Sequence, residues 1–341
     1  MALGAAAKHN RRAVVVTGAT TGIGYACAQL LASHFRNTSE NEEAKPLLLL
    51  GVRDPSTERA ISAARSVERL GADAQLAQLD LSNASSVANF ARDVNHSGLS
   101  VCALLHNAGV APTMPSLSLD GLELAFHTHA LGPHALTQLL KPSLHRAAAE
   151  RNGSAGSVRV VLVGSRLEKQ GSLLLELSKP LEQRFRLLPD ADNQRKYSWM
   201  RAYSTSKQAA TAAFYEHARR FAEDESDPML RSAACVNVCS PGVVNTQLAR
   251  NFPLWLRLLS GPLRASMLKS PKQGADTPVW LLTSEDQAAL RTGKYFLNRN
   301  EIQSSSASCD EYTRLQVWDM LEALWTRISS ESDQTLRENG R

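Results

Sequence analysis

The sequence predicts an α/β protein with a doubly wound, mostly parallel sheet and helices on both faces. Short runs rich in Val, Leu or Ala alternate along the chain with longer Ala- and Leu-rich segments, a pattern typical of βαβ units. The first short run leads directly into a turn with three glycines. A hydrophobic content of 43% over 341 residues indicates a folded globular chain rather than a disordered or fibrous one.

Six segments are expected to form strands, because each is short and apolar enough to be buried on both faces of a parallel sheet. They are residues 13–17, 47–52, 74–79, 101–106, 158–163 and 234–239. Helices are expected over 23–35 and 203–222, and from about Leu122 to near Pro142. The polar segment 37–45 is expected to be a solvated loop, and 167–199 a long irregular excursion.

The chain is expected to form one main domain over residues 13–300. A flexible leader over 1–12 precedes it, and a C-terminal helical extension over 301–341 follows it. The leader has basic residues but no apolar run of the secretory type, so a disordered arm is favoured over a transit peptide. No uninterrupted apolar stretch approaches about 18 residues, which argues against a transmembrane helix.

Charge and cysteine content argue against several classes of protein. The net charge is +5 and no run of five basic residues occurs, so nucleic-acid binding is not expected. The five cysteines are scattered and form no CxxC pair. This distribution argues against a disulfide framework and a zinc site, and it favours a reducing, cytoplasmic location.

A glycine-rich turn separates the first predicted strand from the first predicted helix. It reads Thr17-Gly18-Ala19-Thr20-Thr21-Gly22-Ile23-Gly24. Glycines allow a tight turn and a close backbone approach, and the N-terminus of the following helix offers unpaired N–H groups to a pyrophosphate. The turn therefore predicts a dinucleotide site, with a purely structural turn as the alternative.

Further candidate residues follow the predicted strands, at the sheet edge where open α/β sheets bind ligands. Asp80 and Leu81 follow the third strand, and Asn107, Ala108 and Gly109 follow the fourth.

Arg53 follows the second strand, where NAD-selective proteins usually offer a carboxylate to the ribose 2′-hydroxyl. A guanidinium there favours a 2′-phosphate, so NADP(H) is the predicted cofactor. The alternative is a solvated arginine that pairs with Asp54.

Tyr203 and Lys207 are four residues apart and therefore share one face of a predicted helix. A phenol has a pKa near 10, and a nearby ammonium and a cationic nicotinamide bring it into range for proton transfer near pH 7. Ser165 closes the fifth strand, where its hydroxyl can hydrogen-bond a substrate carbonyl. Each motif is weak alone, but their order along the chain is specific.

This order of motifs resembles the short-chain dehydrogenase/reductase superfamily, with matches from about residue 13 to 296, and it implies a Rossmann-type fold. In that family the serine, tyrosine and lysine are catalytic, and a Pro-Gly segment after the sixth strand contacts the nicotinamide. The residues that match the family's cofactor-binding and catalytic positions are Thr17, Gly18, Thr21, Gly22, Ile23, Gly24, Asp80, Leu81, Asn107, Ala108, Gly109, Ser165, Tyr203, Lys207, Pro241, Gly242, Val244 and Thr246.

Two later segments, 269–275 and 293–296, resemble the retinol dehydrogenase and WW-domain oxidoreductase-like branch. That branch acts largely on lipophilic alcohols and carbonyls with NADP(H). The resemblance implies an NADP(H)-dependent oxidoreductase that interconverts a carbonyl and an alcohol on a retinoid, a steroid or a long-chain aldehyde or ketone.

His129 departs from the family's pattern, because relatives carry a catalytic asparagine at this position. An imidazole also donates and accepts hydrogen bonds, so an altered but working relay is expected, sensitive to protonation of the ring. The alternative is a lost relay in a non-catalytic dinucleotide-binding sensor or scaffold. His127 and His134 lie nearby, but His127 and His129 face different sides of a helix, so no metal site is expected.

Residues 251–269 combine apolar bulk with cations and resemble a substrate lid, within a flap at about 247–270. Such a flap would wall a pocket for a lipophilic substrate and would allow peripheral contact with an intracellular membrane. The alternative is an amphipathic helix packed on the core. The segment 312–328 has helical spacing and is expected to pack on the domain. A homodimer through the helices after the fourth and fifth strands is typical of the family, unless the C-terminal extension blocks it.

Overall fold

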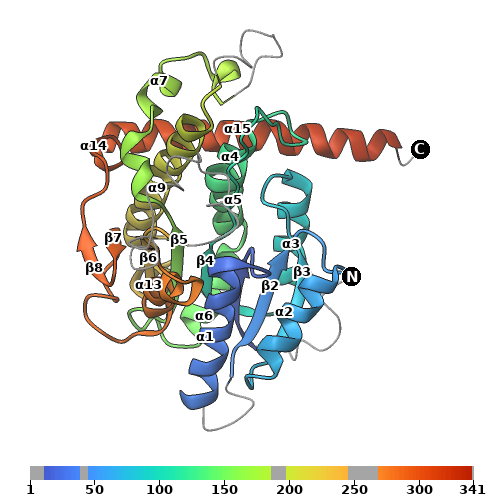
Figure 1. Cartoon of the computed structure of the whole chain (residues 1–341), viewed down its shortest axis with the longest axis vertical. Coiled ribbons are helices and arrows are strands. Elements are labelled where there is room, and N and C mark those ends of the chain that lie inside the picture. The colour runs from blue at the N-terminus through green and yellow to red at the C-terminus, as the bar shows by residue number, and fades with distance from the viewer. Residues whose placement is uncertain (1–10, 39–44, 186–196, 245–267, 340–341) are drawn as a thin grey trace.

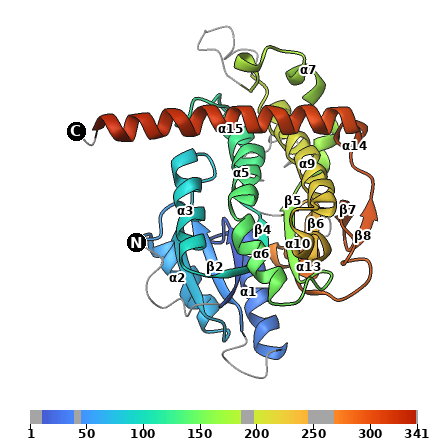
Figure 2. The ribbon, with the colours of Figure 1, turned by 180° about the vertical axis from the view of Figure 1, so that it is seen from behind.

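An eight-stranded sheet forms the centre of the computed structural model, which describes residues 11–38, 45–185, 197–244 and 268–339, with side chains up to 330. The strand order is β3-β2-β1-β4-β5-β6-β7-β8. Neighbouring strands are parallel except for the antiparallel pair β7 and β8. Helices α1, α2 and α13 cover one face, and α3, α5 and α9 cover the other (Figures 1 and 2). The predicted doubly wound fold is confirmed.

The strands are β1 (Arg12–Thr17), β2 (Leu47–Val52), β3 (Ala74–Gln78), β4 (Ser100–His106), β5 (Val158–Val163), β6 (Ala234–Ser240), β7 (Lys294–Leu297) and β8 (Asn300–Ile302). The six predicted strands are all present, with ends that differ by at most one residue. The expectation that each is buried on both faces is wrong for β3, where Ala77 is buried but Gln78 is exposed. The reason is that β3 is an edge strand, with a neighbour on one side only.

The helices are α1 (Gly22–Thr38), α2 (Glu58–Glu68), α3 (Ala84–His96), α4 (Leu124–Phe126), α5 (Gly132–Leu139), α6 (Lys141–Ala149), α7 (Leu173–Leu177), α9 (Trp199–Glu223), α10 (Pro228–Ala233), α13 (Pro271–Thr283), α14 (Ser306–Cys309) and α15 (Glu311–Asn339). Three shorter turns are the π-helix η2 (His127–Leu131) and the 3₁₀-helices η3 (Arg166–Gln170) and η4 (Leu181–Gln183). The excursion expected over 167–199 thus contains short helices.

The helical stretch predicted from Leu122 is divided into several pieces. A π-helical turn separates α4 from α5, and a break at Leu140 separates α5 from α6. Pro142 lies in the first turn of α6 and does not end the preceding helix. A proline is well tolerated in a first turn because its missing N–H would have no partner inside the helix.

Helix α15 lies across α9 and α5 at one end of the molecule (Figures 1 and 2). Its residues Val317, Leu321 and Leu324 are fully or almost fully buried. Polar groups extend this contact, because Nε2 of His134 on α5 lies 3.0 Å from a carboxylate oxygen of Glu322 on α15. The same imidazole lies 3.1 Å from Nε2 of His217 on α9, so one polar chain joins three helices.

Several predicted segments lie outside the described residues: 1–10 of the leader, 39–44 of the polar loop, 186–196 of the excursion, Thr246, 247–267 of the flap and 340–341 of the C-terminal extension. Within the described residues, no helix has both the length and the apolarity needed to cross a bilayer.

Candidate active site

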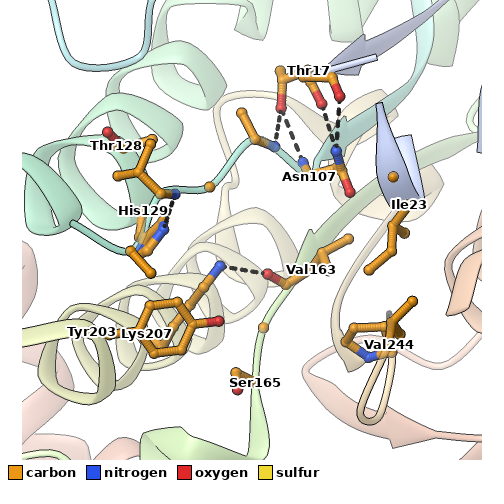
Figure 3. A pocket seen from close by; sticks show the side chains of 18 of the residues that line it. Thr17, Ile23, Asn107, Thr128, His129, Val163, Ser165, Tyr203, Lys207 and Val244 are labelled. Atoms are coloured by element: carbon orange, nitrogen blue, oxygen red, sulfur yellow. Dashed lines mark hydrogen bonds between the residues drawn. The ribbon is translucent and has the colours of Figure 1, made fainter. Parts of the chain in front are cut away.

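A cleft of about 2160 Å³ opens at the carboxyl ends of the central strands. This volume exceeds that of most sites for a single small ligand and suits a dinucleotide together with a substrate. Every site residue predicted from the sequence and described by the structure lines it except Gly24 (Figure 3). The residues that were predicted from the sequence and line the cleft are Thr17, Gly18, Thr21, Gly22, Ile23, Arg53, Asp80, Leu81, Asn107, Ala108, Gly109, His129, Ser165, Tyr203, Lys207, Pro241, Gly242 and Val244.

The turn between β1 and α1 is tied to the end of β4 by side-chain hydrogen bonds (Figure 3). The Thr17 hydroxyl donates to the Leu105 carbonyl and accepts from the backbone N–H groups of Asn107 and Ala108, both at 3.0 Å. The Asn107 amide in turn donates to the carbonyls of Thr17 and Gly18. These bonds hold the glycine turn at the carboxyl edge of the sheet.

Two of the glycines are needed for close packing of this turn. Gly18 has a φ of 66°, and a Cβ there would lie 2.9 Å from Cα of Ala108. A Cβ on Gly24 would lie 2.4 Å from the Gly18 carbonyl oxygen. Gly24 therefore lies beneath the turn and allows α1 to approach it, which explains why this residue does not line the cleft.

The N-terminus of α1 faces the cleft through Thr21, Gly22 and Ile23. No acidic residue occupies the first turn of this 17-residue helix, so the partial positive charge of its N-terminus is not neutralised there. A glycine turn followed by a helix N-terminus fits the pyrophosphate of a dinucleotide.

Two exposed arginines line the cleft at the end of β2. The carboxylate of Asp54 accepts hydrogen bonds from the backbone N–H and hydroxyl of Ser56. Among the described residues no ion pair joins Arg53 to Asp54, so the alternative pairing is absent. Arg59, in the first turn of α2, lines the same end of the cleft. Sequence reasoning missed Arg59, although a second cation at the start of the next helix was an available signal.

Asp80 and Leu81 follow β3 and are held by short-range contacts. The Asp80 carboxylate accepts hydrogen bonds from the backbone N–H and hydroxyl of Ser82, at 2.9 and 2.6 Å. Gly132 begins α5 against this segment, and a Cβ on it would lie 2.1 Å from the Leu81 carbonyl oxygen. Only glycine lets α5 pack this closely on the loop.

Helix α9 places Tyr203 and Lys207 on its buried face, toward the end of β5. The Lys207 ammonium donates a 2.8 Å hydrogen bond to the carbonyl of Val163, two residues before Ser165 (Figure 3). Burial lowers the pKa of Lys207 to about 8, partly offset by Cys239. Burial raises the pKa of Tyr203, and hydrogen bonding with Ser165 opposes that shift. The phenol, the ammonium and the hydroxyl all face the cleft.

His129 lies in the π-helical turn, and both of its ring nitrogens are engaged within the protein. Nε2 accepts a 3.0 Å hydrogen bond from the backbone N–H of Val110. The ring proton must therefore be on Nδ1, which lies 2.8 Å from the Ser206 hydroxyl. The Ser206 hydroxyl in turn donates a 2.7 Å hydrogen bond to the Tyr203 carbonyl.

Burial, with the nearby Lys207 charge, lowers the pKa of His129 well below its ordinary value of 6.5. The imidazole is therefore neutral near pH 7, and the expected sensitivity to its protonation has no support in this geometry. Sequence reasoning missed Ser206, which lies inside the Tyr203–Lys207 motif.

The other nearby histidines have separate partners. Nδ1 of His127 lies 3.0 Å from the hydroxyl of Ser118, whereas His134 contacts His217 and Glu322. Across the ranges that the structure describes, no three His, Cys, Asp or Glu side chains are grouped so that they could hold a metal ion.

Comparison with known proteins places this site in a family. The model of the short chain dehydrogenase family matches residues 12–175. Polyprenol dehydrogenase from Mus musculus is 30% identical over 308 residues, which cover 90% of this chain and 82% of the relative. Retinol dehydrogenase 14 from Mus musculus is 29% identical over 328 residues, 92% of this chain and 85% of the relative.

Solved structures share the fold. NADPH-bound carbonyl reductase from chicken fatty liver aligns with a TM-score of 0.59 at 19% identity, over 86% of this chain and 99% of its own. Carbonyl reductase Sniffer of D. melanogaster aligns with a TM-score of 0.57 at 16% identity, over 87% of this chain and all of its own. With these matches, the chain belongs to the retinol dehydrogenase-like branch of the short-chain dehydrogenase/reductase family and is an NAD(P)-binding oxidoreductase of the CH–OH group.

Proposed function

We propose that this oxidoreductase uses NADP(H) to interconvert a carbonyl and an alcohol on a lipophilic molecule such as a retinoid, a steroid or a long-chain aldehyde or ketone. The observation that carries this proposal is the shared cleft. Tyr203, Lys207 and Ser165 face it at one end, and two arginines face it at the other. The names of the relatives, polyprenol dehydrogenase and retinol dehydrogenase 14, support a lipophilic alcohol as the substrate.

The preference for NADP(H) is supported by the charge at the end of β2. Neither Arg53 nor Arg59 has an ion-pair partner in the part of the chain that the structure describes. A 2′-phosphate carries between one and two negative charges near pH 7, and guanidinium groups bind phosphate oxygens by paired hydrogen bonds. A 2′-hydroxyl would leave both cations without a partner.

When bound, the nicotinamide would supply or accept the hydride. Tyr203 would protonate the carbonyl oxygen during reduction and take the proton back during oxidation. Lys207 would favour the phenolate by its charge and would bind the ribose. Ser165 would donate a hydrogen bond to the substrate oxygen as negative charge develops there.

His129 would position these groups rather than exchange protons with the substrate. One of its hydrogen bonds is to Val110, in the loop after β4, and the other is to Ser206, on helix α9. The ring therefore joins this loop to the helix that carries Tyr203 and Lys207. A neutral ring with both nitrogens engaged is suited to holding two elements in register.

The substrate half of the cleft supports a lipophilic ligand. Its lining includes aliphatic side chains from five separate segments of the chain, and such walls bind apolar molecules by excluding water. These residues are Val110, Ala111, Pro112, Leu167, Met200, Val243 and Leu268.

Two further expectations belong to this proposal: peripheral contact of a cytoplasmic protein with an intracellular membrane through 251–269, and self-association. Helix α15 covers part of α5 and α9, the helices through which a homodimer was expected. Vesicle flotation and sedimentation equilibrium of the full chain test the two expectations separately.

The proposed activity is tested by incubating the purified protein with NADPH or NADH and a panel of retinal, steroid ketones and simple aldehydes. We expect NADPH to be consumed with a lipophilic carbonyl. Tyr203→Phe should abolish turnover while cofactor still binds, and Tyr215→Phe, on the same helix but outside the cleft, should retain it. Cofactor binding without turnover of any carbonyl would contradict the proposal and favour a sensor.

A further inference from the structure

Two cations stand on one face of the short helix that follows Ser165. Helix η3 is a 3₁₀-helix, which has three residues per turn, so the side chains of Arg166 and Lys169 leave it in the same direction. Both side chains are exposed and both line the cleft. The 3₁₀ rise of about 2 Å per residue puts Lys169 roughly 8 Å along the helix from Ser165.

Glu168 holds the opposite side of η3 in the protein interior. Its carboxylate is fully buried and accepts hydrogen bonds from the backbone N–H and hydroxyl of Ser305, at 2.7 and 2.6 Å, and from the hydroxyl of Ser308 at 2.9 Å. These bonds fix which face of η3 meets the cleft. They also engage the carboxylate that is nearest in sequence to Arg166 and Lys169.

The far end of η3 is fixed against the helix that carries the proposed acid–base pair. A Cβ on Gly171 would lie 2.4 Å from the side-chain oxygen of Gln208. Gln208 directly follows Lys207 and also accepts a hydrogen bond from the backbone N–H of Leu173. The two cations are therefore held on a segment whose position relative to Tyr203 and Lys207 is set by packing.

Neither cation has a counter-ion within the described parts of the chain. Between described residues, no hydrogen bond or ion pair forms at the Arg166 or Lys169 side chain, and like charges one turn apart repel each other. The carboxylates among the described lining residues, Asp54 and Asp80, follow β2 and β3 at the adenosine end. Lys269 adds a third cation to the lining and hydrogen-bonds Asn298.

We propose that the substrate is a lipophilic carbonyl or alcohol that also carries a terminal anionic group, a carboxylate or a phosphate, bound by Arg166 and Lys169. This inference rests on the proposed function and narrows its substrate class. The reacting carbon would lie at Ser165 and Tyr203, the apolar chain along the aliphatic wall, and the anion against η3. A positive, partly enclosed surface favours such a group through charge-assisted hydrogen bonds.

The test compares aldehydes of one chain length, chosen to span the roughly 8 Å from Ser165 to Lys169, that differ only at the far end. They are an ω-oxo fatty acid, its methyl ester, the corresponding ω-oxo alkyl phosphate and the corresponding ω-oxo alkyl trimethylammonium compound. For the wild type we expect kcat/KM to be about tenfold higher for an anionic aldehyde than for the ester, a difference of about 1.4 kcal/mol. The advantage should appear in KM and shrink with added salt. The carboxylate and phosphate arms show which anion is preferred.

Variants assign the effect to the two cations. Replacing both Arg166 and Lys169 by Gln should bring the anionic aldehyde to within about twofold of the ester, with turnover of the ester unchanged. Replacing both by Glu should make the trimethylammonium aldehyde the better substrate. The matched control replaces Arg65 and Arg231 by Gln, which removes the same charge outside the cleft and should leave the preference intact.

Calorimetric titration of the cofactor-loaded protein with an unreactive fatty acid and its methyl ester reports the cation site apart from the chemistry. The proposal is supported if the wild type binds the acid more tightly than the ester and the double Gln variant does not. It is supported even if no aldehyde is reduced, because a lack of reduction would overturn only the proposed function. Equal binding of acid and ester, or equal loss of both in the variant, overturns the proposal. The proposal is also overturned if the double Gln variant keeps the preference for the acid over the ester but no longer binds phosphatidylserine vesicles. That outcome would show that the two cations bind a membrane.

Discussion

The backbone N–H of Val110 donates a 3.0 Å hydrogen bond to Nε2 of His129. An N–H group can only donate, so this bond fixes the imidazole in the tautomer that carries its proton on Nδ1. The proton then points to Ser206, whose hydroxyl donates to the carbonyl of Tyr203. A residue that departs from the family's asparagine thus links the loop after β4 to the helix of the proposed acid–base pair.

This link predicts how variants at His129 and Ser206 behave. Ser206→Ala leaves the buried Nδ1–H without an acceptor and should lower the free energy of unfolding by about 1–3 kcal/mol. His129→Ala should lower kcat further than His129→Asn, whose amide oxygen can still accept from an N–H. Urea unfolding and steady-state kinetics measure the two effects.

The pKa of His129 adds a pH criterion. Because burial keeps it well below 6.5, the acid limb of the pH–rate profile between about pH 5 and 7 should be the same in wild type and His129→Asn. Loss of an acid limb in the variant would show instead that the ring titrates during catalysis.

Lys207 predicts a pH dependence of cofactor affinity. Burial lowers its pKa to about 8, so the ammonium is present below that pH and is lost as the pH rises through it. The proposed contact with ribose and the attraction to the cofactor's phosphates should weaken at the same time. Fluorescence titration should therefore give a higher Kd for NADPH at about pH 9.5 than at pH 7. In Lys207→Met the Kd should be higher and independent of pH over this range, and a flat wild-type profile would count against the assignment.

Arg53 and Arg59 predict the choice between the two dinucleotides. Arg53→Asp should raise the KM for NADPH at least about tenfold while it lowers that for NADH, because a carboxylate repels the 2′-phosphate and accepts from a 2′-hydroxyl. Arg59→Ala should weaken the binding of NADPH but not that of NADH. Arg65→Ala, on the same helix but outside the cleft, is the matched control. If the ratio of the KM values for NADPH and NADH is the same in Arg53→Asp as in the wild type, this end of the cleft does not bind the 2′-phosphate.

Buried histidines predict a loss of stability in acid. Burial lowers the pKa of five of them: His106 to about 3, His127 to about 4, and His129, His134 and His217 as well. The folded chain keeps these rings neutral, whereas the unfolded chain binds protons below about pH 6.5. Their contribution is therefore complete above that pH and declines below it, by up to about 1.4 kcal/mol per histidine per pH unit.

Urea unfolding at a series of pH values measures this slope. His106→Gln should make it shallower, and exposed His96→Gln should leave it unchanged. A free energy of unfolding that stays constant from about pH 7 to 5 would show that the folded chain takes up the same protons.

The strands and the glycine turn were predictable from the sequence, because short apolar runs and glycine spacing act through local backbone geometry. The predicted strands are present, and the turn meets the loop after β4 where parallel strands end together. Local sequence patterns predicted less well the burial of the edge strand and the short helix after Ser165. The β3 edge strand is partly exposed, and η3 lay inside a segment read as irregular.

What only the tertiary structure decided is the state of each polar group. The sequence alone showed that His129, Tyr203 and Lys207 exist and in what order they occur. The hydrogen bond from Val110, the burial that lowers the pKa of Lys207, and the placement of Glu168 on the inner side of η3 all depend on segments distant in the chain. Partners, burial and the direction of a side chain are properties of packing, and packing brings together residues that sequence distance does not relate.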